Sequence, residues 1–384
     1  MKLRQINFTP SYKQIAGLCT VFLCLILGIL LYKYYIYTYF PSEPIPTGEF
    51  PNEAVWVFSA DEEITATPTI YGFEVFIRTK NSICALDLST GSVIWQKKSV
   101  GISPLSIAPQ VSDDIIVVPE TGSKLAAFSI KTGDLLWRTT ELEINLKNPD
   151  IGAIESFEIL NKVIYVDRSE LGLTAYRIID GEILWHKEVL GRLIHYISVD
   201  DKSVYLNSGY LLRAYNNENG KLLWEKRFNN LLGPLLVDED YLYVSLLTGN
   251  DALISINLRT LGEVWRLGSN SLNYYGIRNL MIQDKILYIA TDRLSAISKT
   301  DAQVHWISDK TGLLEPPIIA GGKIFVRNID TTLFYLNAIN GEELGSLLVQ
   351  MNTAMKHQPS RSPVMASGLL VIPFGDNRVF AYRP

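Results

Sequence analysis

The stretch Ala85-Leu86-Asp87-Leu88-Ser89-Thr90-Gly91-Ser92-Val93-Ile94-Trp95 contains the unit that is repeated along this chain of 384 residues. Apolar and polar residues alternate before the glycine, as in a strand with one buried face. Asp87 can hydrogen-bond to its own backbone and begin a turn, and Gly91 can adopt the positive φ that a tight hairpin requires. The stretch therefore predicts a β-hairpin whose second strand buries Trp95.

The unit recurs along the chain. A turn glycine precedes the tryptophan by four residues in three more copies: Gly133 with Trp137, Gly181 with Trp185, and Gly220 with Trp224. The other tryptophans are Trp56, Trp265 and Trp306, and successive tryptophans are 39 to 48 residues apart. This period is typical of propeller blades of four short strands. We expect these tryptophans and glycines to be structural.

Three copies are irregular. Gly262 precedes Trp265 by three residues, Ala302 replaces the glycine before Trp306, and Gly345 stands where a tryptophan is expected. We expect packing between units to be weakest around these three copies.

Each hairpin follows two further predicted strands, so a unit has four strands, A to D, with the tryptophan on D. The last unit, 362–382, has no D strand, whereas residues 54–60 offer Trp56 without a preceding A, B or C strand. Pairing of strand 54–60 with the C-terminal blade would close a ring without open edges. The predicted fold is all-β: an eight-bladed β-propeller over residues 54–384, in four-stranded antiparallel blades.

The N-terminal segment has a membrane-anchor pattern. Residues 1–14 contain Lys2, Arg4 and Lys13 and no acidic residue, and residues 15–40 are almost entirely apolar. That length suits a transmembrane helix, and the basic flank predicts a cytoplasmic N-terminus with the propeller outside. Residues 41–53 form a Pro-rich linker. The alternative is a cleaved signal peptide, but the apolar run is longer than usual and ends in the bulky Tyr39-Phe40-Pro41.

Composition limits the possible partners. The formal net charge is −5, and no cluster of Lys and Arg stands out, which argues against nucleic acid. Cys19 and Cys24 lie in the apolar segment, so Cys84 is alone in the body of the chain and has no intrachain partner there.

The pattern Ala-x-Asp-x-x-Thr-Gly-x-x-x-Trp, complete from Ala85 to Trp95, resembles the repeat of the pyrroloquinoline-quinone (PQQ)-like β-propellers. The resemblance covers about residues 54–384 and implies that each repeat tryptophan docks one blade onto the next. The family contains quinoprotein dehydrogenases, which bind PQQ and calcium, and non-enzymatic propellers similar to BamB, an outer-membrane protein assembly factor. The chain is similar to the second group.

Residues for catalysis are not evident. The dehydrogenases typically have two adjacent cysteines over the cofactor and long insertions, and this chain has neither. Its four histidines show no metal-ligand spacing, and no phosphate-binding loop appears. We therefore expect no enzyme activity, no catalytic or metal site and no cofactor. A PQQ-dependent oxidoreductase or quinone sensor is the alternative function.

Function is expected in the loops. The longer loops are mainly B–C and D–A connections, which lie at one end of the ring. Their candidate partner-binding residues are Asn145, Asn250, Asp251, Lys356, His357 and Arg361. We expect a membrane-anchored, extracytoplasmic scaffold that binds another envelope protein, in the periplasm or at the cell surface. A third possibility is a polysaccharide-binding surface protein, for which Tyr274-Tyr275 is the candidate contact.

Overall fold

The computed structural model describes residues 53–99, 107–121, 123–139, 153–168, 171–189, 195–272, 276–313, 316–328, 332–348, 361–374 and 377–384. The expected tail, membrane helix and nearly all of the linker lie outside these residues. Within them, no helix has the length and apolar character needed to cross a membrane.

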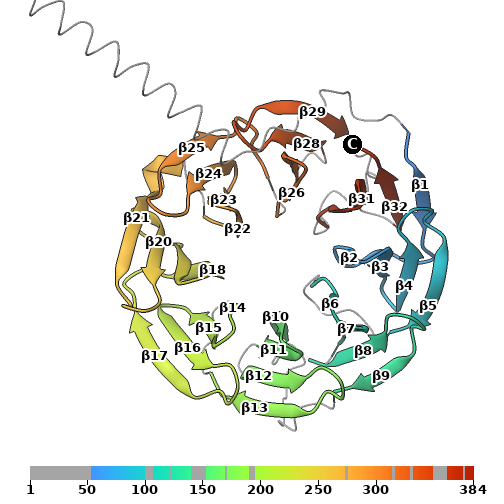
Figure 1. The fold of residues 1–384 in the computed structure, drawn as a ribbon, viewed down its shortest axis with the longest axis horizontal. Helices are drawn as coiled ribbons and strands as arrows, with labels where there is room; N and C mark the ends of the chain where they lie inside the picture. Colours follow the sequence, from blue (N-terminus) through green and yellow to red (C-terminus); the bar gives the residue numbers. More distant parts are fainter. Residues whose placement is uncertain are drawn as a thin grey trace, which may run out of the picture. The chain divides into compact units, whose positions relative to one another are not determined.

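The described strands form eight four-stranded antiparallel sheets around a ring (Figure 1). Blades 1 to 4 contain β2 (Thr69–Tyr71), β3 (Glu74–Arg78), β4 (Ser82–Asp87), β5 (Val93–Lys98); β6 (Gln110–Ser112), β7 (Ile115–Pro119), β8 (Leu125–Ser129), β9 (Leu135–Arg138); β10 (Ile154–Leu160), β11 (Val163–Arg168), β12 (Gly172–Arg177), β13 (Ile183–Lys187); and β14 (His195–Val199), β15 (Ser203–Ser208), β16 (Leu211–Asn216), β17 (Leu222–Arg227).

Blades 5 to 8 complete the ring. They contain β18 (Leu232–Asp238), β19 (Tyr241–Leu246), β20 (Asp251–Asn257), β21 (Glu263–Gly268); β22 (Asn279–Gln283), β23 (Ile286–Ala290), β24 (Leu294–Ser298), β25 (Val304–Ile307); β26 (Ile318–Ala320), β27 (Lys323–Arg327), β28 (Thr332–Asn337), β29 (Glu343–Leu348); and β30 (Val364–Ala366), β31 (Leu369–Pro373), β32 (Arg378–Tyr382), β1 (Trp56–Ser59). A short 3₁₀ helix, η1 (Ser269–Leu272), follows β21.

The eighth blade joins the two ends of the propeller. β1 pairs antiparallel with β32, from Trp56 opposite Ala381 to Ser59 opposite Arg378. The predicted all-β, eight-bladed fold is confirmed. The A strands surround the axis and the D strands form the outer wall (Figure 1).

The core lies between blades. Strand B is covered on both faces, and every residue of β7 and of β31 is buried. One buried cluster joins Phe76 and Ala85 of blade 1 to Ile116 and Phe128 of blade 2, and other clusters join other neighbouring blades in the same way. A blade therefore buries apolar side chains against its neighbours as well as within its own sheet.

The turn between strands C and D forms as its sequence predicts. The Asp87 carboxylate accepts hydrogen bonds from the backbone N–H groups of Ser89 and Thr90, at 3.0 and 2.8 Å. The Gly91 N–H then donates to the carbonyl of Asp87, and Gly91 has a φ of 69°. The hydroxyls of Ser89 and Thr90 and these N–H groups lower the pKa of Asp87.

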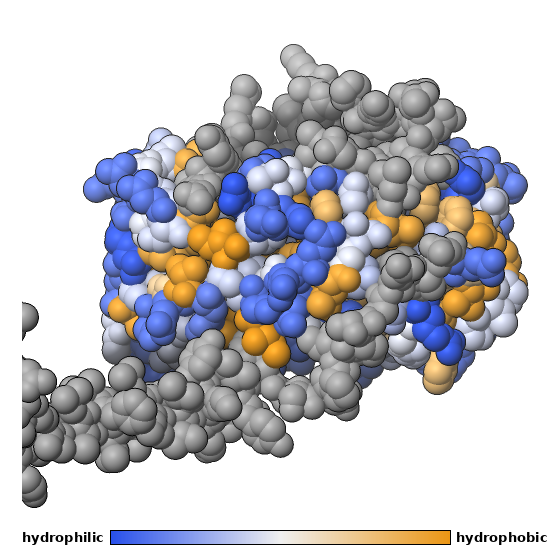
Figure 2. All heavy atoms as spheres, turned by 90° about the horizontal axis from the view of Figure 1, so that it is seen from above, coloured by the Kyte–Doolittle hydropathy of each residue, from blue (hydrophilic) through white to orange (hydrophobic). Residues whose placement is uncertain are grey.

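A β-bulge shapes each described C–D pair that contains a turn. In blade 1 the register shifts between Ala85, opposite Trp95, and Leu86, opposite Val93. The extra residue lets Val93 and Ile94 both face solvent, about half exposed, while Trp95 still points inward. Exposed apolar residues therefore recur along the wall. Figure 2, a view onto the part of the wall drawn at the top of Figure 1, shows hydrophobic side chains in small patches between hydrophilic ones.

Candidate functional site

The predicted partner-binding residues that the structure describes lie in different surroundings. Asn250 is exposed in the B–C loop of blade 5, where its carbonyl accepts hydrogen bonds from the backbone N–H and hydroxyl of Ser269. Asp251 begins β20, and its carboxylate lies 2.5 Å from a guanidinium nitrogen of Arg266 on β21. Asn250 is thus accessible, whereas Asp251 already has a partner within its blade.

Arg361 differs from the expectation of a surface charge. Its side chain is only 4% exposed and lies 3.3 Å from the carboxylate of Glu63. Its carbonyl accepts a hydrogen bond from the guanidinium of Arg327, at 2.7 Å. Sequence position in a long loop misled us, because the end of that loop is buried against blade 7 and the N-terminal strand region. Arg361 is therefore not part of the surface that we propose below.

The remaining predicted contacts, Asn145, Lys356, His357 and the Tyr274-Tyr275 pair, lie outside the described residues. Asn250 and Asp251 are neighbours in blade 5, whereas Arg361 precedes β30 of blade 8.

The described residues include no group of three or more His, Cys, Asp or Glu side chains placed to hold a metal ion. Cys84 is their free thiol, and burial raises its pKa to about 11, so it stays protonated.

The repeat tryptophans make a shared contact with the following blade. Six of them donate their indole N–H to a backbone carbonyl in the C–D turn of that blade: Trp56 to Leu88 (2.8 Å), Trp95 to Ile130 (2.6 Å), Trp137 to Ile178 (2.8 Å), Trp185 to Asn217 (2.9 Å), Trp265 to Lys299 (3.1 Å) and Trp306 to Ala338 (3.1 Å). We call each of these an interblade contact.

The turn glycine is required by the same contact. A Cβ placed on Gly91, Gly133, Gly181 or Gly220 would lie 2.5–2.6 Å from the indole ring of the preceding blade, closer than real atoms approach. These glycines also have φ values of 66° to 71°. Glycine is therefore required at each position for two reasons: a side chain would overlap the tryptophan of the preceding blade, and the turn needs a positive φ.

The turn of blade 5 departs from this arrangement. Leu261, with a φ of 56°, takes the position of the turn glycine, and Gly262 comes one residue later. Trp224 of blade 4 faces this turn. Among the described residues, its indole N–H makes no hydrogen bond, and the ring is only partly buried.

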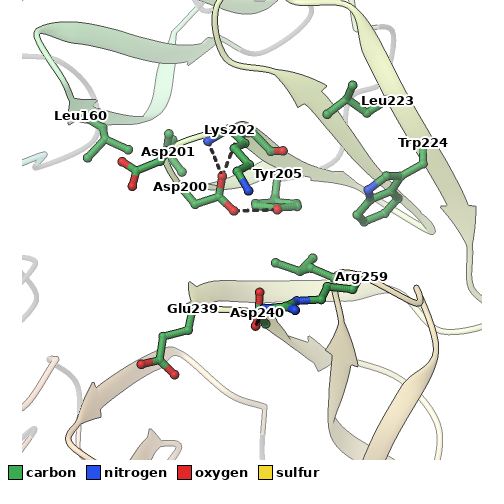
Figure 3. Close-up of a pocket in the computed structure, with 13 residues that line it drawn as sticks. Leu160, Asp200, Asp201, Lys202, Tyr205, Leu223, Trp224, Glu239, Asp240 and Arg259 are labelled. Carbon is green, nitrogen blue, oxygen red and sulfur yellow. Dashed lines mark hydrogen bonds and ion pairs between the residues drawn. The ribbon is translucent and has the colours of Figure 1, made fainter.

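A pocket of about 880 Å³ opens beside Trp224 (Figure 3). Its lining comes from the A–B turns of blades 3 to 5, from β17 and from the C–D turn of blade 5. The residues are Leu160, Val199, Asp200, Asp201, Lys202, Ser203, Tyr205, Leu223, Trp224, Glu239, Asp240, Leu258 and Arg259. The pocket is therefore at the end of the ring that has the A–B and C–D turns, not the end with the longer loops.

The pocket is held by local hydrogen bonds. The Asp200 carboxylate accepts from the backbone N–H of Lys202 and Ser203, at 2.8 and 2.7 Å, and from the Tyr205 hydroxyl, at 2.8 Å. Arg259 donates to the Asp240 carboxylate at 2.6 Å, which lowers the pKa of Asp240. Burial chiefly raises the pKa of Tyr205, so its hydroxyl stays protonated as a donor to Asp200.

Sequence reasoning missed this site, because Asp200-Asp201 and Asp238-Glu239-Asp240 resemble ordinary solvated turns. The available signal was the shift of Gly262 by one residue. That shift was assigned to its own blade, but the tryptophan that it affects is Trp224, in the blade before.

Comparison with known proteins identifies the family. The model of the family described as outer membrane protein assembly factor BamB matches residues 49–155, 169–280 and 255–384. Proteins named outer membrane protein assembly factor BamB are 35% identical over 82 residues in Francisella salina and 25% identical over 204 residues in Yersinia pestis. These matches cover 21% and 49% of this chain, and the chain spans 15% and 50% of those relatives.

Solved structures share the fold. BamB from Moraxella catarrhalis superposes with a TM-score of 0.68 at 15% identity, over 86% of this chain and 99% of that one. Quinohemoprotein alcohol dehydrogenase from Comamonas testosteroni gives 0.65 at 13% identity, over 86% and 76%. At these identities the similarity shows the fold alone, so the family assignment rests on the sequence match: this chain belongs to the PQQ-like propeller family of the outer membrane protein assembly factor BamB.

Proposed function

We propose that this protein is a membrane-anchored, extracytoplasmic propeller that acts as a non-catalytic scaffold in the assembly of outer-membrane proteins. The observation that carries the proposal is the family match, whose three segments together extend from residue 49 to residue 384.

The proposed contact surface is the end of the ring with the B–C and D–A loops. Asn250 is exposed there, in the loop between β19 and β20. Lys356 and His357 belong by sequence to another loop of that end. Loops on a rigid propeller can vary without loss of the blades that position them, which suits recognition of a partner.

Affinity capture of the full-length chain from detergent-solubilised membranes tests this function. We expect outer-membrane assembly proteins to co-purify, and Asn250→Lys and Lys356→Glu to reduce their recovery. Glu218→Lys, an exposed C–D turn residue at the opposite end, is the matched control. If Glu218→Lys alone reduces recovery, the assigned surface is incorrect.

The anchor has a separate test. We propose residues 15–40 as a single-pass helix with a cytoplasmic N-terminus, because their uncharged run matches the thickness of a bilayer. The full chain of 43.2 kDa should stay in membranes during alkaline extraction. Recovery of a shorter, soluble chain would instead indicate a cleaved signal peptide.

Incubation of the purified propeller with PQQ and Ca²⁺ tests the alternative enzyme. We expect no retained cofactor absorbance after gel filtration and no dye-linked oxidation of alcohols. Stoichiometric PQQ with turnover would replace the scaffold proposal with an oxidoreductase.

A further inference from the structure

The indole N–H of Trp224 makes no hydrogen bond among the described residues, whereas the indole N–H groups of the six other repeat tryptophans do. In the other interblade contacts the indole N–H reaches a backbone carbonyl of the next turn at 2.6–3.1 Å. The position equivalent to those carbonyls is Leu258, and no such bond forms there. Figure 3 shows the indole nitrogen of Trp224 on the side of the ring that faces the pocket.

The side chain at the turn explains the difference. Where the turn residue is glycine, the indole lies against it. Where it is Ala302, Trp265 keeps its bond to the Lys299 carbonyl, at 3.1 Å. Where it is Leu261, the side chain is larger still. At Gly91 even a single Cβ would overlap the indole ring, so the side chain of Leu261 leaves no room for an indole in that position. The bond is absent there among the described residues. The pocket beside Trp224 thus occurs at the one described interblade position where the turn residue has a side chain larger than that of alanine.

The carbonyl acceptor that Trp224 lacks indicates which ligand the pocket binds. All six satisfied indole N–H groups bind a backbone carbonyl, so a peptide carbonyl has the chemistry and approach that Trp224 lacks. Leu160, Leu223 and Leu258 supply apolar surface beside it, and Leu223 is 49% exposed.

Charge selects among peptides. Four carboxylates line the pocket, Asp200, Asp201, Glu239 and Asp240, against two cations, Lys202 and Arg259. Asp240 is paired with Arg259, whereas the side chain of Glu239 is 74% exposed with Lys299 3.7 Å away. An incoming lysine or arginine would gain Coulomb energy from this excess of negative charge.

We infer that this pocket binds an extended protein segment with a lysine or arginine next to an apolar residue, whose backbone carbonyl accepts the Trp224 indole N–H. This binding site lies at the opposite end of the ring from the partner surface proposed above. It does not depend on that surface or on outer-membrane assembly.

The substitution Leu261→Gly should close the site without removing any lining residue. With glycine restored, we expect Trp224 to lie against the turn and to donate to the Leu258 carbonyl. The indole N–H signal of Trp224 in a ¹H–¹⁵N spectrum, assigned with Trp224→Phe, should then exchange with solvent more slowly. Ala302→Gly, the same kind of change in the next interblade contact, is the control and should leave the Trp224 signal unaltered.

Binding is measured with a fluorescein-labelled peptide of alternating lysine and leucine, against one of alternating glutamate and leucine. We expect the lysine peptide to bind the full chain and to shift the Trp224 indole signal, and the glutamate peptide to do neither. Leu261→Gly should weaken the lysine peptide by about tenfold or more, a loss of about 1.4 kcal/mol, and Ala302→Gly should not.

Three results would overturn the inference: no binding of the lysine peptide, equal binding of both peptides, or lysine-peptide binding that Leu261→Gly leaves unchanged. None of these bears on the loops at the other end. Loss of partner capture by Asn250→Lys with unaltered peptide binding would separate the two sites.

Discussion

At the scale of single residues, the turn glycine and the tryptophan form one contact although they lie in different blades. Trp95 lies against Gly133, 38 positions later, and donates to the Ile130 carbonyl. Within one blade, the glycine therefore contacts the tryptophan of the preceding blade, and the tryptophan contacts the glycine of the following blade. Sequence alone identified both residue types, but not that the partner of each tryptophan is the glycine of the following copy, because that pairing is made only when blades stack.

Substitution of alanine at two glycines separates backbone strain from the interblade contact. Gly72 and Gly133 have φ values of 59° and 70°, but a Cβ at Gly72 meets nothing within 4 Å, whereas one at Gly133 overlaps Trp95. Gly72→Ala should cost about 1 kcal/mol from the left-handed backbone. Gly133→Ala should cost a further 1–3 kcal/mol or so from overpacking. Thermal unfolding of both variants measures the difference, and equal losses would contradict the contact.

Glu158 makes stability depend on pH. It lies on β10, and burial raises its pKa to about 7, only partly offset by a hydrogen bond from the backbone N–H of Val199. Because the folded protein holds this proton more tightly than the unfolded chain, Glu158 favours folding below about pH 4.5, and this contribution is lost as pH rises through 7.

Glu158→Gln keeps an acceptor for Val199 and removes the titration. We expect the variant to gain stability over the parent between pH 5 and pH 8, on the order of 2 kcal/mol at the upper end. Melting temperatures across this range provide the measurement, with the exposed Glu218→Gln as control. A gain that is the same at pH 5 and pH 8 would show that Glu158 is already ionised at pH 5.

At the scale of elements, blade 7 differs from the others because its large aromatic residue is on strand C and the small residue opposite it is on strand D. In the other seven blades the tryptophan of strand D lies opposite a small residue of strand C, Ala85, Ala127, Ala175, Ala214, Ser255, Ala296 or Ala381. In blade 7, Tyr335 lies opposite Gly345, and a Cβ on that glycine would overlap the tyrosine hydroxyl. The tyrosine is 2% exposed and stacks against Phe325.

The chain topology explains why blade 7 has no tryptophan. Every interblade contact uses the C–D turn of the next blade, but strands C and D of blade 8 come from opposite ends of the chain and share no turn. A tryptophan at position 345 would have no such turn to contact. Sequence reasoning treated this copy as degraded, whereas Trp306 beside it makes a regular contact with the Ala338 carbonyl.

A double-mutant cycle tests this exchange. Gly345→Trp should destabilise the protein by about 1–3 kcal/mol or more, because the indole and the phenol compete for one space. Tyr335→Ala alone should also destabilise, through the cavity that it leaves. The double variant should be more stable than Gly345→Trp. Additive losses measured by chemical unfolding would show that the two positions do not share the space.

At the scale of the whole molecule, much of the architecture could be predicted from the sequence. Period, turn residues and the missing D strand near Pro384 indicated eight blades and closure through Trp56, and the pairing of β1 with β32 agrees. The pocket at Trp224 and the burial of Arg361 were not predicted, because each depends on contacts between blades; the shift of Gly262 is visible in the sequence, but the tryptophan that it affects is identified only when the blades stack. Alternation within a strand is local, whereas those contacts join residues of different blades.

The molecule has two ends with different chemistry. The loop end presents Asn250 for the proposed envelope partner, and the turn end presents the pocket beside Trp224. The interblade Trp–Gly contacts hold the blades together, so the residues at either end of the ring can vary without loss of the fold.

Site-specific photocrosslinking in living cells tests most directly that the loop end binds an assembly partner. A photoreactive residue replaces Asn250 in one variant. A second variant, with the photoreactive residue at Val93 on the outer wall, is the reference. We predict a crosslinked product with an outer-membrane assembly protein from position 250 and none from position 93. Crosslinking of that protein from position 93 alone, or no product from position 250, would contradict it.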